Sequence, residues 1–289
     1  MSAAALTKPR AASLVDGEFP LTAGDFRALA ELVYAASGIS LQESKAALVY
    51  SRLAKRLRVL GLKSFGAYVT LVADDADERA RLLMALTTNV TRFFREPHHF
   101  DHLVDTVLAP RADAVRRGAS LRLWSAACST GQEPYSMALA VLSVWPDAAD
   151  LDVRILATDI DNNVLATARA GAYSAEAIEA IPAAFRNRWL VKDENTARTW
   201  RVGPEARALI AYKPLNLNGE WPMRRRFDAI FCRNVVIYFD EPTQATLWRR
   251  FRDQLAPGGR LYVGHSERVG DTTFESDGQT VYRLAGGAR

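Results

Sequence analysis

Apolar residues recur every three or four positions between residues 22 and 88, and this spacing predicts α-helices. Turn and capping residues divide the region into four helical segments: 22–38, 40–61, 64–73 and 75–88. In the first segment Phe26, Leu29 and Val33 share one face. Four short helices in about 70 residues indicate a small helical bundle.

The ends of these segments carry capping signals. The predicted N-caps are Thr22, Ser40 (with Glu43 in capping-box spacing), Ser64 and Asp75, and the predicted terminating glycines are Gly38 and Gly61. A further helical stretch is expected at about 98–117, broken at Pro110.

From residue 121 onward the pattern changes, and strand-like apolar runs alternate with helix-like segments. The strand-like runs are 121–127, 153–159, 227–233, 260–266 and 280–285, and the helix-like segments are 133–145, 161–170 and 242–256. Such alternation predicts an α/β domain whose mainly parallel sheet is covered on both faces. Residues 174–220 fit the alternation poorly, since they are polar and rich in arginine, with short strands predicted only near 196–202.

These patterns predict four parts of the chain. They are a flexible tail (1–19), an N-terminal all-helical domain (20–88), a linker and helix that contribute to the functional site (89–120), and an α/β domain (121–289) with a small β insertion at about 188–213.

The composition is that of an ordinary globular protein, with 49% apolar and 24% charged residues. Neither a long apolar span nor a secretory signal is recognised, which predicts a cytoplasmic protein without membrane insertion. Cys128 and Cys232 stand in unrelated contexts, so we expect small buried hydrophobes, with a thiol nucleophile as the alternative. The formal net charge of +4 favours an acidic partner without specifying its class.

The candidate chemistry begins at the turn after the first strand, "WSAACSTGQEPYS" (124–136). Ligands of open α/β sheets lie beyond the carboxyl ends of the strands. Asp159, at the end of the second strand, can accept hydrogen bonds from ribose hydroxyls. The turn contains a single glycine, Gly131, and lacks the patterns that hold phosphates. Glu133 would repel a phosphate but could hold an ammonium group, so an adenosyl amino acid, S-adenosylmethionine, fits.

Five stretches in this order closely resemble the chemotaxis receptor glutamate O-methyltransferases, the CheR family. They are "LTTNVTRFFREPHHF", "WSAACSTGQEPYSMA", "LATDID", "FCRNVVIYFD" and "GHSE". The resemblance covers about residues 20–284. It implies the Rossmann-like sheet of S-adenosylmethionine-dependent methyltransferases, with a helical N-terminal domain and a small β insertion.

The resemblance also implies a set of site residues. Cofactor-binding positions are Asn89, Thr91, Arg95, Glu133, Asp159, Asn216, Leu217, Arg233 and Asn234, and the residues nearest the transferred methyl are Arg95 and Tyr238. S-adenosylhomocysteine is the implied product, and no metal is expected. His98 and His102 have a spacing that can chelate a metal, but no third ligand is evident in the sequence.

The implied reaction is attack of a glutamate carboxylate on the sulfonium methyl. A side-chain carboxylate is ionised at neutral pH, so no strong general base is required. Catalysis then depends on positioning, in which Arg95 orients the carboxylate and Tyr238 donates a hydrogen bond or packs against the sulfonium. Phe93 and Phe94 are expected to pack rather than to contact the ligand.

The implied partner is the cytoplasmic helical domain of chemoreceptors. On the basic segment 43–61, Lys45, Arg52 and Arg56 share a face that suits either solvent or an acidic receptor. The β insertion could bind the receptor's C-terminal peptide, although its few glycines favour peptide-independent docking.

Two alternatives remain open. A nucleic-acid methyltransferase would fit the basic charge, but "RNVVIYF" after the fourth strand lacks the prolines common in amino-methylating enzymes, so no nucleic acid is expected. A non-catalytic receptor-binding adaptor would be favoured by loss of Arg95, Asp159 or Tyr238, all of which are present.

Overall fold

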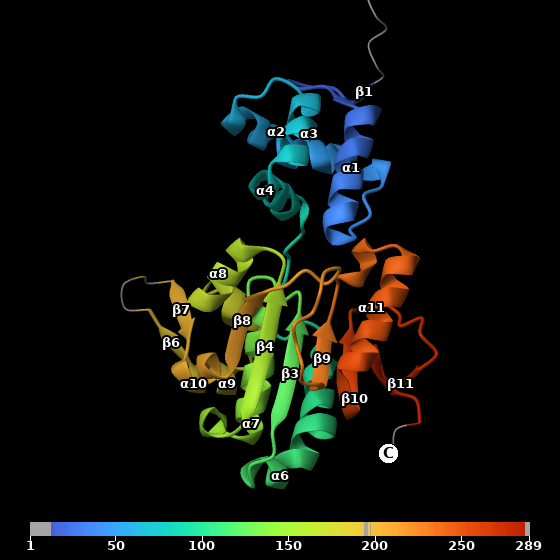
Figure 1. Ribbon diagram of the computed structural model, residues 1–289. Helices are drawn as coiled ribbons and strands as arrows, with labels where there is room; N and C mark the ends of the chain where they lie inside the picture. The colour runs from blue at the N-terminus through green and yellow to red at the C-terminus, as the bar shows by residue number, and fades with distance from the viewer. Residues whose placement is uncertain (1–12, 194–195, 197, 287–289) are drawn as a thin grey trace, which may run out of the picture. The chain divides into compact units, whose positions relative to one another are not determined.

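The computed structural model describes residues 13–193, 196 and 198–286, and the chain divides into two compact units, Met1–Thr87 and Thr88–Arg289 (Figure 1). No helix in these described ranges is both long and apolar enough to cross a lipid bilayer.

The first unit contains the four predicted helices. They are α1 (Ala23–Ser37), α2 (Ala46–Leu60), α3 (Phe65–Asp74) and α4 (Ala76–Leu86). Phe26, Leu29 and Val33 are buried in its core, as their spacing predicts. Thr22 forms a capping box with Asp25, and Ser64 and Asp75 cap the following helices through their side chains.

Two expectations for this unit were wrong. Ser40 does not cap α2, because a short 3₁₀ turn, η1 (Glu43–Lys45), leads into that helix and Gln42 precedes it without a side-chain cap. Part of the expected tail is ordered, since β1 (Ser13–Val15) pairs with β2 (Leu21–Thr22). The remainder of that tail, residues 1–12, lies outside the described residues.

The second unit is built on a seven-stranded sheet. Its strands are β3 (Leu121–Ala126), β4 (Val153–Asp159), β8 (Ile210–Pro214), β9 (Phe227–Cys232), β10 (Leu255–Val263), β11 (Phe274–Gly278) and β12 (Val281–Leu284). The order β11-β12-β10-β9-β3-β4-β8 places five parallel strands beside an antiparallel pair. The parallel part has the 3-2-1-4-5 order of doubly wound nucleotide-binding folds. The α/β prediction is therefore confirmed, with β8 and β11 added.

Alternate residues of each strand serve the two faces of this sheet. Leu123, Ile155 and Phe231 belong to the main core, which also contains α7 (Gln132–Val144). On the opposite face Trp124 packs against Phe251 of α11 (Glu241–Gln254). Helices thus cover both faces, and Figure 1 shows α11 and α7 flanking the strands.

The helical stretch before β3 is irregular. It comprises α5 (His98–His102), a π-helical segment η2 (Leu103–Leu108), a 3₁₀ turn η3 (Ala109–Arg111) that contains Pro110, and α6 (Ala112–Arg116). The predicted break at Pro110 is therefore a change of helix type, because proline is tolerated at the start of a helical turn.

The β insertion is a separate three-stranded antiparallel sheet of order β5-β7-β6, with β5 at Ala172–Ser174, β6 at Leu190–Lys192 and β7 at Thr199–Val202. Two short helices, α9 (Ala183–Trp189) and α10 (Pro204–Ala208), accompany it. The small sheet thus includes β5, before the predicted range 188–213, whereas residues 210–213 lie in the main sheet as part of β8.

Candidate functional site

The first turn of the α/β unit, after β3, is bound to the end of β4. The backbone N–H of Ser129 donates to Asp159 Oδ2 at 2.8 Å, and the N–H of Asp161 donates to Asp159 Oδ1 at 3.0 Å. Asp161 in turn caps α8 (Asn162–Ala170), as its position predicts. Burial raises the pKa of the Asp159 carboxyl, although these N–H groups oppose the shift. The carboxylate is thereby fixed beside the turn.

Asn89 approaches the same turn from the segment before α5. Its backbone oxygen accepts a hydrogen bond from Ser129 Oγ at 2.8 Å, and its amide Nδ2 donates to Asp161 Oδ2 at 3.2 Å. Asn89 and Asp159 therefore meet at one place, although 70 residues separate them in the chain.

Glu133, in the first turn of α7, belongs to a buried charge network. Its Oε1 accepts from Ser125 Oγ at 2.7 Å, and Arg233 Nη1 lies 3.2 Å from Oε2. The same guanidinium contacts Glu96 Oε2 at 3.1 Å and donates to the Arg95 carbonyl. Burial raises the pKa of the Glu133 carboxyl, while Arg233 and Ser125 oppose the shift.

Glu96 is the second carboxylate that contacts Arg233 in this network. Burial alone would raise the pKa of its carboxyl, but Arg233 and His265 outweigh burial and lower it to about 2. Arg233 is thus held between two carboxylates with its side chain only 2% exposed.

The segment after β8 lies next to the end of β4 because the two strands are neighbours. The N–H of Leu215 donates to the Asp159 carbonyl at 2.9 Å. Asn216 and the buried Leu217 follow, and Arg250 of α11 anchors this segment because its Nη1 donates to the Leu217 carbonyl at 2.7 Å.

The segment after β9 carries Asn234 and then the 3₁₀ turn η6 (Val236–Tyr238). Asn234 has φ of 60°, and Tyr238 is half-buried. The backbone N–H groups of this loop donate to the carboxylate of Glu267, which follows β10. Arg95 lies on the segment before α5, where its Nη1 donates to the Val90 carbonyl at 3.3 Å. Thr91 is half-buried on that segment.

Strained backbone gathers around these residues. Of the described non-glycine residues, those with positive φ are Phe94, Glu96, Ala127, Ser129, Asn234 and Thr280. All but Thr280 belong to the segment before α5, the turn after β3 or the loop after β9. A left-handed conformation costs energy in most residues and concentrates where function requires a particular geometry. The backbone therefore identifies the same loops as the sequence motifs.

Two residues of the network were missed in the sequence. They are Glu96, which directly follows Arg95, and Glu267, which follows the predicted strand 260–266. A carboxylate directly after a strand that ends near a predicted site is a signal that could have indicated Glu267. Nothing in the local sequence distinguishes Glu96 from an exposed acid.

Other candidate residues have structural roles. Cys128 and Cys232 are buried and free, as predicted, and burial raises the pKa of each thiol, which disfavours a nucleophilic thiolate. The rings of Phe93 and Phe94 pack against Tyr173 and Phe100, which confirms their packing role.

The two histidines with chelating spacing contact protein atoms. His98 Nε2 is 3.3 Å from the Gln279 carbonyl, and His102 Nδ1 is 3.0 Å from Tyr262 Oη. In the part of the chain that the structure describes, no cluster of three or more His, Cys, Asp or Glu has metal-binding geometry.

Arg52 and Arg56 have internal partners that the sequence pattern did not indicate. Arg56 forms a two-pronged ion pair with buried Glu78, with Nε 2.7 Å from Oε1 and Nη2 2.5 Å from Oε2. Arg52 Nη1 donates to the carbonyls of Leu86 and Thr87 at the end of α4, each at 2.8 Å. Both guanidinium groups therefore stabilise the helical unit itself.

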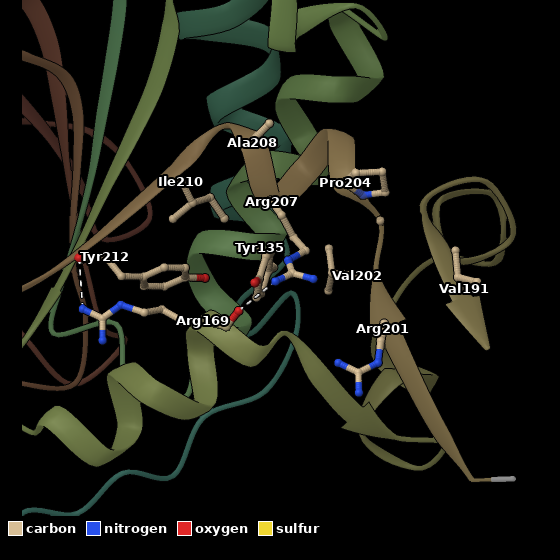
Figure 2. Close-up of a pocket in the computed structure, with 11 residues that line it drawn as sticks. Tyr135, Arg169, Val191, Arg201, Val202, Pro204, Arg207, Ala208, Ile210 and Tyr212 are labelled. Carbon is tan, nitrogen blue, oxygen red and sulfur yellow. Dashed lines mark hydrogen bonds between the residues drawn. The ribbon is translucent and has the colours of Figure 1, made fainter. Parts of the chain in front are cut away.

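A pocket of about 610 Å³ lies where the small sheet meets the main one (Figure 2). Its lining includes Arg169, Arg201, Arg207, Tyr135, Tyr212 and Val191 of the edge strand β6. Figure 2 shows that Arg169 donates a hydrogen bond to the Tyr212 carbonyl and that Arg207 donates one to the Arg169 carbonyl. No carboxylate lines it among the described residues, but Arg201 Nε is paired with Asp193 Oδ2 at 2.8 Å, so Arg169 and Arg207 give the pocket its positive charge.

The fold and the site together define a class, the methyltransferases that bind S-adenosylmethionine on a doubly wound sheet. Residues 89–282 match the family model "CheR methyltransferase, SAM binding domain", and residues 24–87 match "CheR methyltransferase, all-alpha domain". The chain belongs to the CheR methyltransferase family.

Named relatives support this assignment over nearly the whole chain. A probable chemotaxis protein methyltransferase of Rhizobium etli is 52% identical, with 87% of this chain and 96% of that protein covered. Chemotaxis protein methyltransferase 2 of Pseudomonas aeruginosa is 45% identical, with 93% and 95% covered. The chemotaxis protein methyltransferase of Escherichia coli is 40% identical, with 92% of each covered.

The side chains present fit S-adenosylmethionine. Asp159 and Glu133 supply buried carboxylates for hydroxyl and ammonium groups, and Asn89 and Asn216 supply amides. The turn between β3 and α7 carries no lysine or arginine that would neutralise a phosphate.

Proposed function

We propose that this chain methylates glutamate side chains of chemoreceptors, using S-adenosylmethionine and releasing S-adenosylhomocysteine, for sensory adaptation in the cytoplasm. The observation that carries the proposal is that Asn89 and Asp159 both bond to Ser129 in the turn between β3 and α7, with Glu133 directly after that turn, in a chain that belongs to the CheR family. When bound, the cofactor would supply an electrophilic methyl group on a positively charged sulfur.

In the proposed site each residue has one task. Asp159 accepts hydrogen bonds from the ribose hydroxyls, and Glu133 attracts the ammonium group. Asn216 and Leu217 contact the adenine, and Asn89, Thr91 and Asn234 complete the enclosure. Arg233 opposes the effect of burial and favours the ionised form of Glu133 through their 3.2 Å contact.

The catalytic step needs orientation more than proton transfer. Arg95 holds the incoming glutamate carboxylate by charge-assisted hydrogen bonds, and Tyr238 stands beside the reacting sulfur. Because the carboxylate is already ionised at neutral pH, no residue of this chain has to remove a proton.

A methyl-transfer assay tests this proposal. The chain is incubated with labelled S-adenosylmethionine and a cytoplasmic receptor fragment, and the products are mapped by mass spectrometry. Label on glutamates that is lost in Glu→Ala receptor variants supports the proposal. Label on nucleic acid would favour a nucleic-acid methyltransferase, and receptor binding without transfer would favour an adaptor.

As the alternative to the peptide-independent docking that the few glycines of the insertion favour, we further propose a site for the receptor's C-terminal peptide at the small sheet. β6 lies at an edge of that sheet, so a peptide can pair with it as an added strand. The arginines of the neighbouring pocket would attract the terminal carboxylate. Calorimetry with a free-acid and an amidated C-terminal peptide distinguishes the cases. Tighter binding of the free acid supports this site, and no binding of either favours docking without the peptide.

The helical unit is proposed to contact the receptor's helical domain. Since Arg52 and Arg56 are engaged internally, exposed Lys45 and Lys55 are better candidates for that contact. The double variant Lys45→Glu, Lys55→Glu should weaken receptor methylation and leave cofactor affinity unchanged. Unaltered methylation by that variant would contradict this contact.

A further inference from the structure

Glu267 has an unusual set of partners for a residue in a loop. Its Oε1 accepts the N–H groups of Val235, Val236 and Ile237 at 2.8, 2.7 and 3.3 Å. Its Oε2 accepts those of Asn234 and Gly264 at 2.8 and 2.6 Å. Five backbone donors therefore converge on one carboxylate, which uses all of its roughly four lone-pair positions.

The carboxylate is withdrawn from solvent, since Glu267 is only 4% exposed. A buried charge is expensive unless hydrogen bonds satisfy it, and here main-chain donors alone do so. An ordinary cap would satisfy the first N–H groups of η6, but it would not account for the bonds from Asn234 and Gly264. The geometry therefore joins two loops, one after β9 and one after β10.

The close approach at this junction depends on glycine. A Cβ atom built on Gly264 would lie 2.6 Å from Asn234 Nδ2 and 2.8 Å from Glu267 Oε2. Any larger residue would push the two loops apart. The left-handed backbone of Asn234, at φ 60°, is held by the same carboxylate.

We propose that Glu267 is a positioning residue that fixes the loop 234–238, and through it Asn234 and Tyr238, in the geometry needed for methyl transfer. The inference rests on the proposed function, because the tasks of Asn234 and Tyr238 come from it. Glu267 touches neither substrate nor cofactor in this account. It sets the main-chain path from which those side chains project.

The variant Glu267→Gln tests the proposal with little change in shape. An amide oxygen can still accept from three N–H groups, but its NH₂ group must face the remaining donors. We expect kcat to fall by at least about tenfold, with the KM for the receptor fragment within about twofold. The control is Glu220→Gln, which changes an exposed carboxylate of the same unit and should leave kcat unchanged.

A double-mutant cycle separates positioning from general destabilisation. If Glu267 acts through Tyr238, then Glu267→Gln should cost less than about twofold in a Tyr238→Phe background. Additive losses of kcat in the cycle, or a single variant as active as wild type, would overturn the proposal.

Amide NMR gives a readout that does not require activity. The N–H signals of Asn234–Ile237 and Gly264 should move upfield in Glu267→Gln, because they lose charged acceptors. Unchanged signals would overturn the proposal even if kcat falls. An inactive wild-type chain would instead contradict the proposed function, and these signals would then decide the positioning claim alone.

If Glu267→Gln does not fold, Gly264→Ala perturbs the same contact between the two loops and leaves the carboxylate in place. Its added methyl group should displace Asn234 and lower kcat by about the same factor as loss of the carboxylate. A Gly264→Ala chain with wild-type kcat and unshifted loop amides would count against the proposal.

Discussion

Arginine–carboxylate contacts in the two units look alike in composition and differ in surroundings. In the helical unit, Arg56 meets Glu78 through two parallel hydrogen bonds, and Tyr68 Oη adds a third at 3.1 Å. In the α/β unit, Arg233 lies between Glu96 and Glu133. Glu78 has all its partners within the helical unit, whereas Glu96 lies on the segment before α5 and Glu133 lies in the first turn of α7, beside the candidate cofactor site.

The backbone explains why only one of these contacts belongs to a candidate site. Around Arg56 the chain is regular helix, but Glu96 and Asn234 beside Arg233 have left-handed backbone. In the described residues, Arg233 Nε also lacks a hydrogen-bond partner. A buried ion pair is therefore weak evidence of function by itself, and strained neighbours with unsatisfied polar atoms are stronger evidence.

The largest expected effect is a loss of methyl-transfer activity when Arg95 of the α/β unit is replaced. Arg95→Ala should lower kcat/KM for receptor methylation by about 100-fold, because a charged orienting group is removed from the reacting carboxylate. Steady-state methyl transfer measures it. Arg92→Ala, which changes an exposed arginine three residues away, should stay within about twofold. Activity of Arg95→Ala within a few-fold of wild type would refute its assigned role.

Replacing Arg56 of the helical unit should instead lower the stability of the protein. Arg56→Ala leaves the Glu78 carboxylate buried without its main partner, and should lower the free energy of unfolding by about 2 kcal/mol. This value allows for the partial exposure of the Arg56 side chain. Urea denaturation measures the loss, and Arg58→Ala on the same helix, which removes an exposed ion pair with Glu18, is the control. A fully stable Arg56→Ala chain with weakened receptor methylation would restore the docking interpretation.

A smaller effect tests the charge at the turn. Glu133→Gln should weaken binding of S-adenosylmethionine and S-adenosylhomocysteine by about tenfold, since both carry an ammonium group. Binding of methylthioadenosine, which lacks that group, should change little. Calorimetric titration of the three ligands gives the comparison. Equal weakening of all three would show that Glu133 supports the fold rather than the ammonium group.

The smallest expected effect is on the pH dependence of stability, through His99, which lies near Arg233. Burial, together with the charge of Arg233, lowers the pKa of the His99 imidazole from 6.5 to about 3. The folded state therefore favours neutral His99, so its contribution to stability is complete above pH 6.5 and is lost as the pH falls toward 3. His99→Gln should flatten the decline of stability between about pH 6.5 and 4.5 in urea titrations. An unchanged slope would argue against this origin.

Much of the fold could be predicted because periodicity and caps are local. The strand 153–159 and the caps Thr22, Ser64 and Asp75 have the positions expected from sequence. β8 and β11 could not be assigned in this way. β8 is a five-residue edge strand with only Ile210, Ala211 and Tyr212 as apolar members, so its pairing with β4 decides its conformation.

The candidate site was less predictable, because its contacts join distant segments. Asp159 and Glu133 were recognisable from their places after strands, and family motifs added Asn89 and Tyr238. The Glu78 partner of Arg56, and four of the five partners of Glu267, lie more than 20 residues away in the chain. Sequence patterns therefore indicated only a solvent-exposed or receptor-facing role for Arg56, and they did not place Glu267 in the site.

The most direct test of the central claim is a crystal structure of the chain with S-adenosylhomocysteine. The account predicts the ribose hydroxyls within hydrogen-bond distance of the Asp159 carboxylate and the ammonium group on the Glu133 side of the turn between β3 and α7. An adenosyl group bound elsewhere, or a site without ligand at saturating concentration, would contradict it.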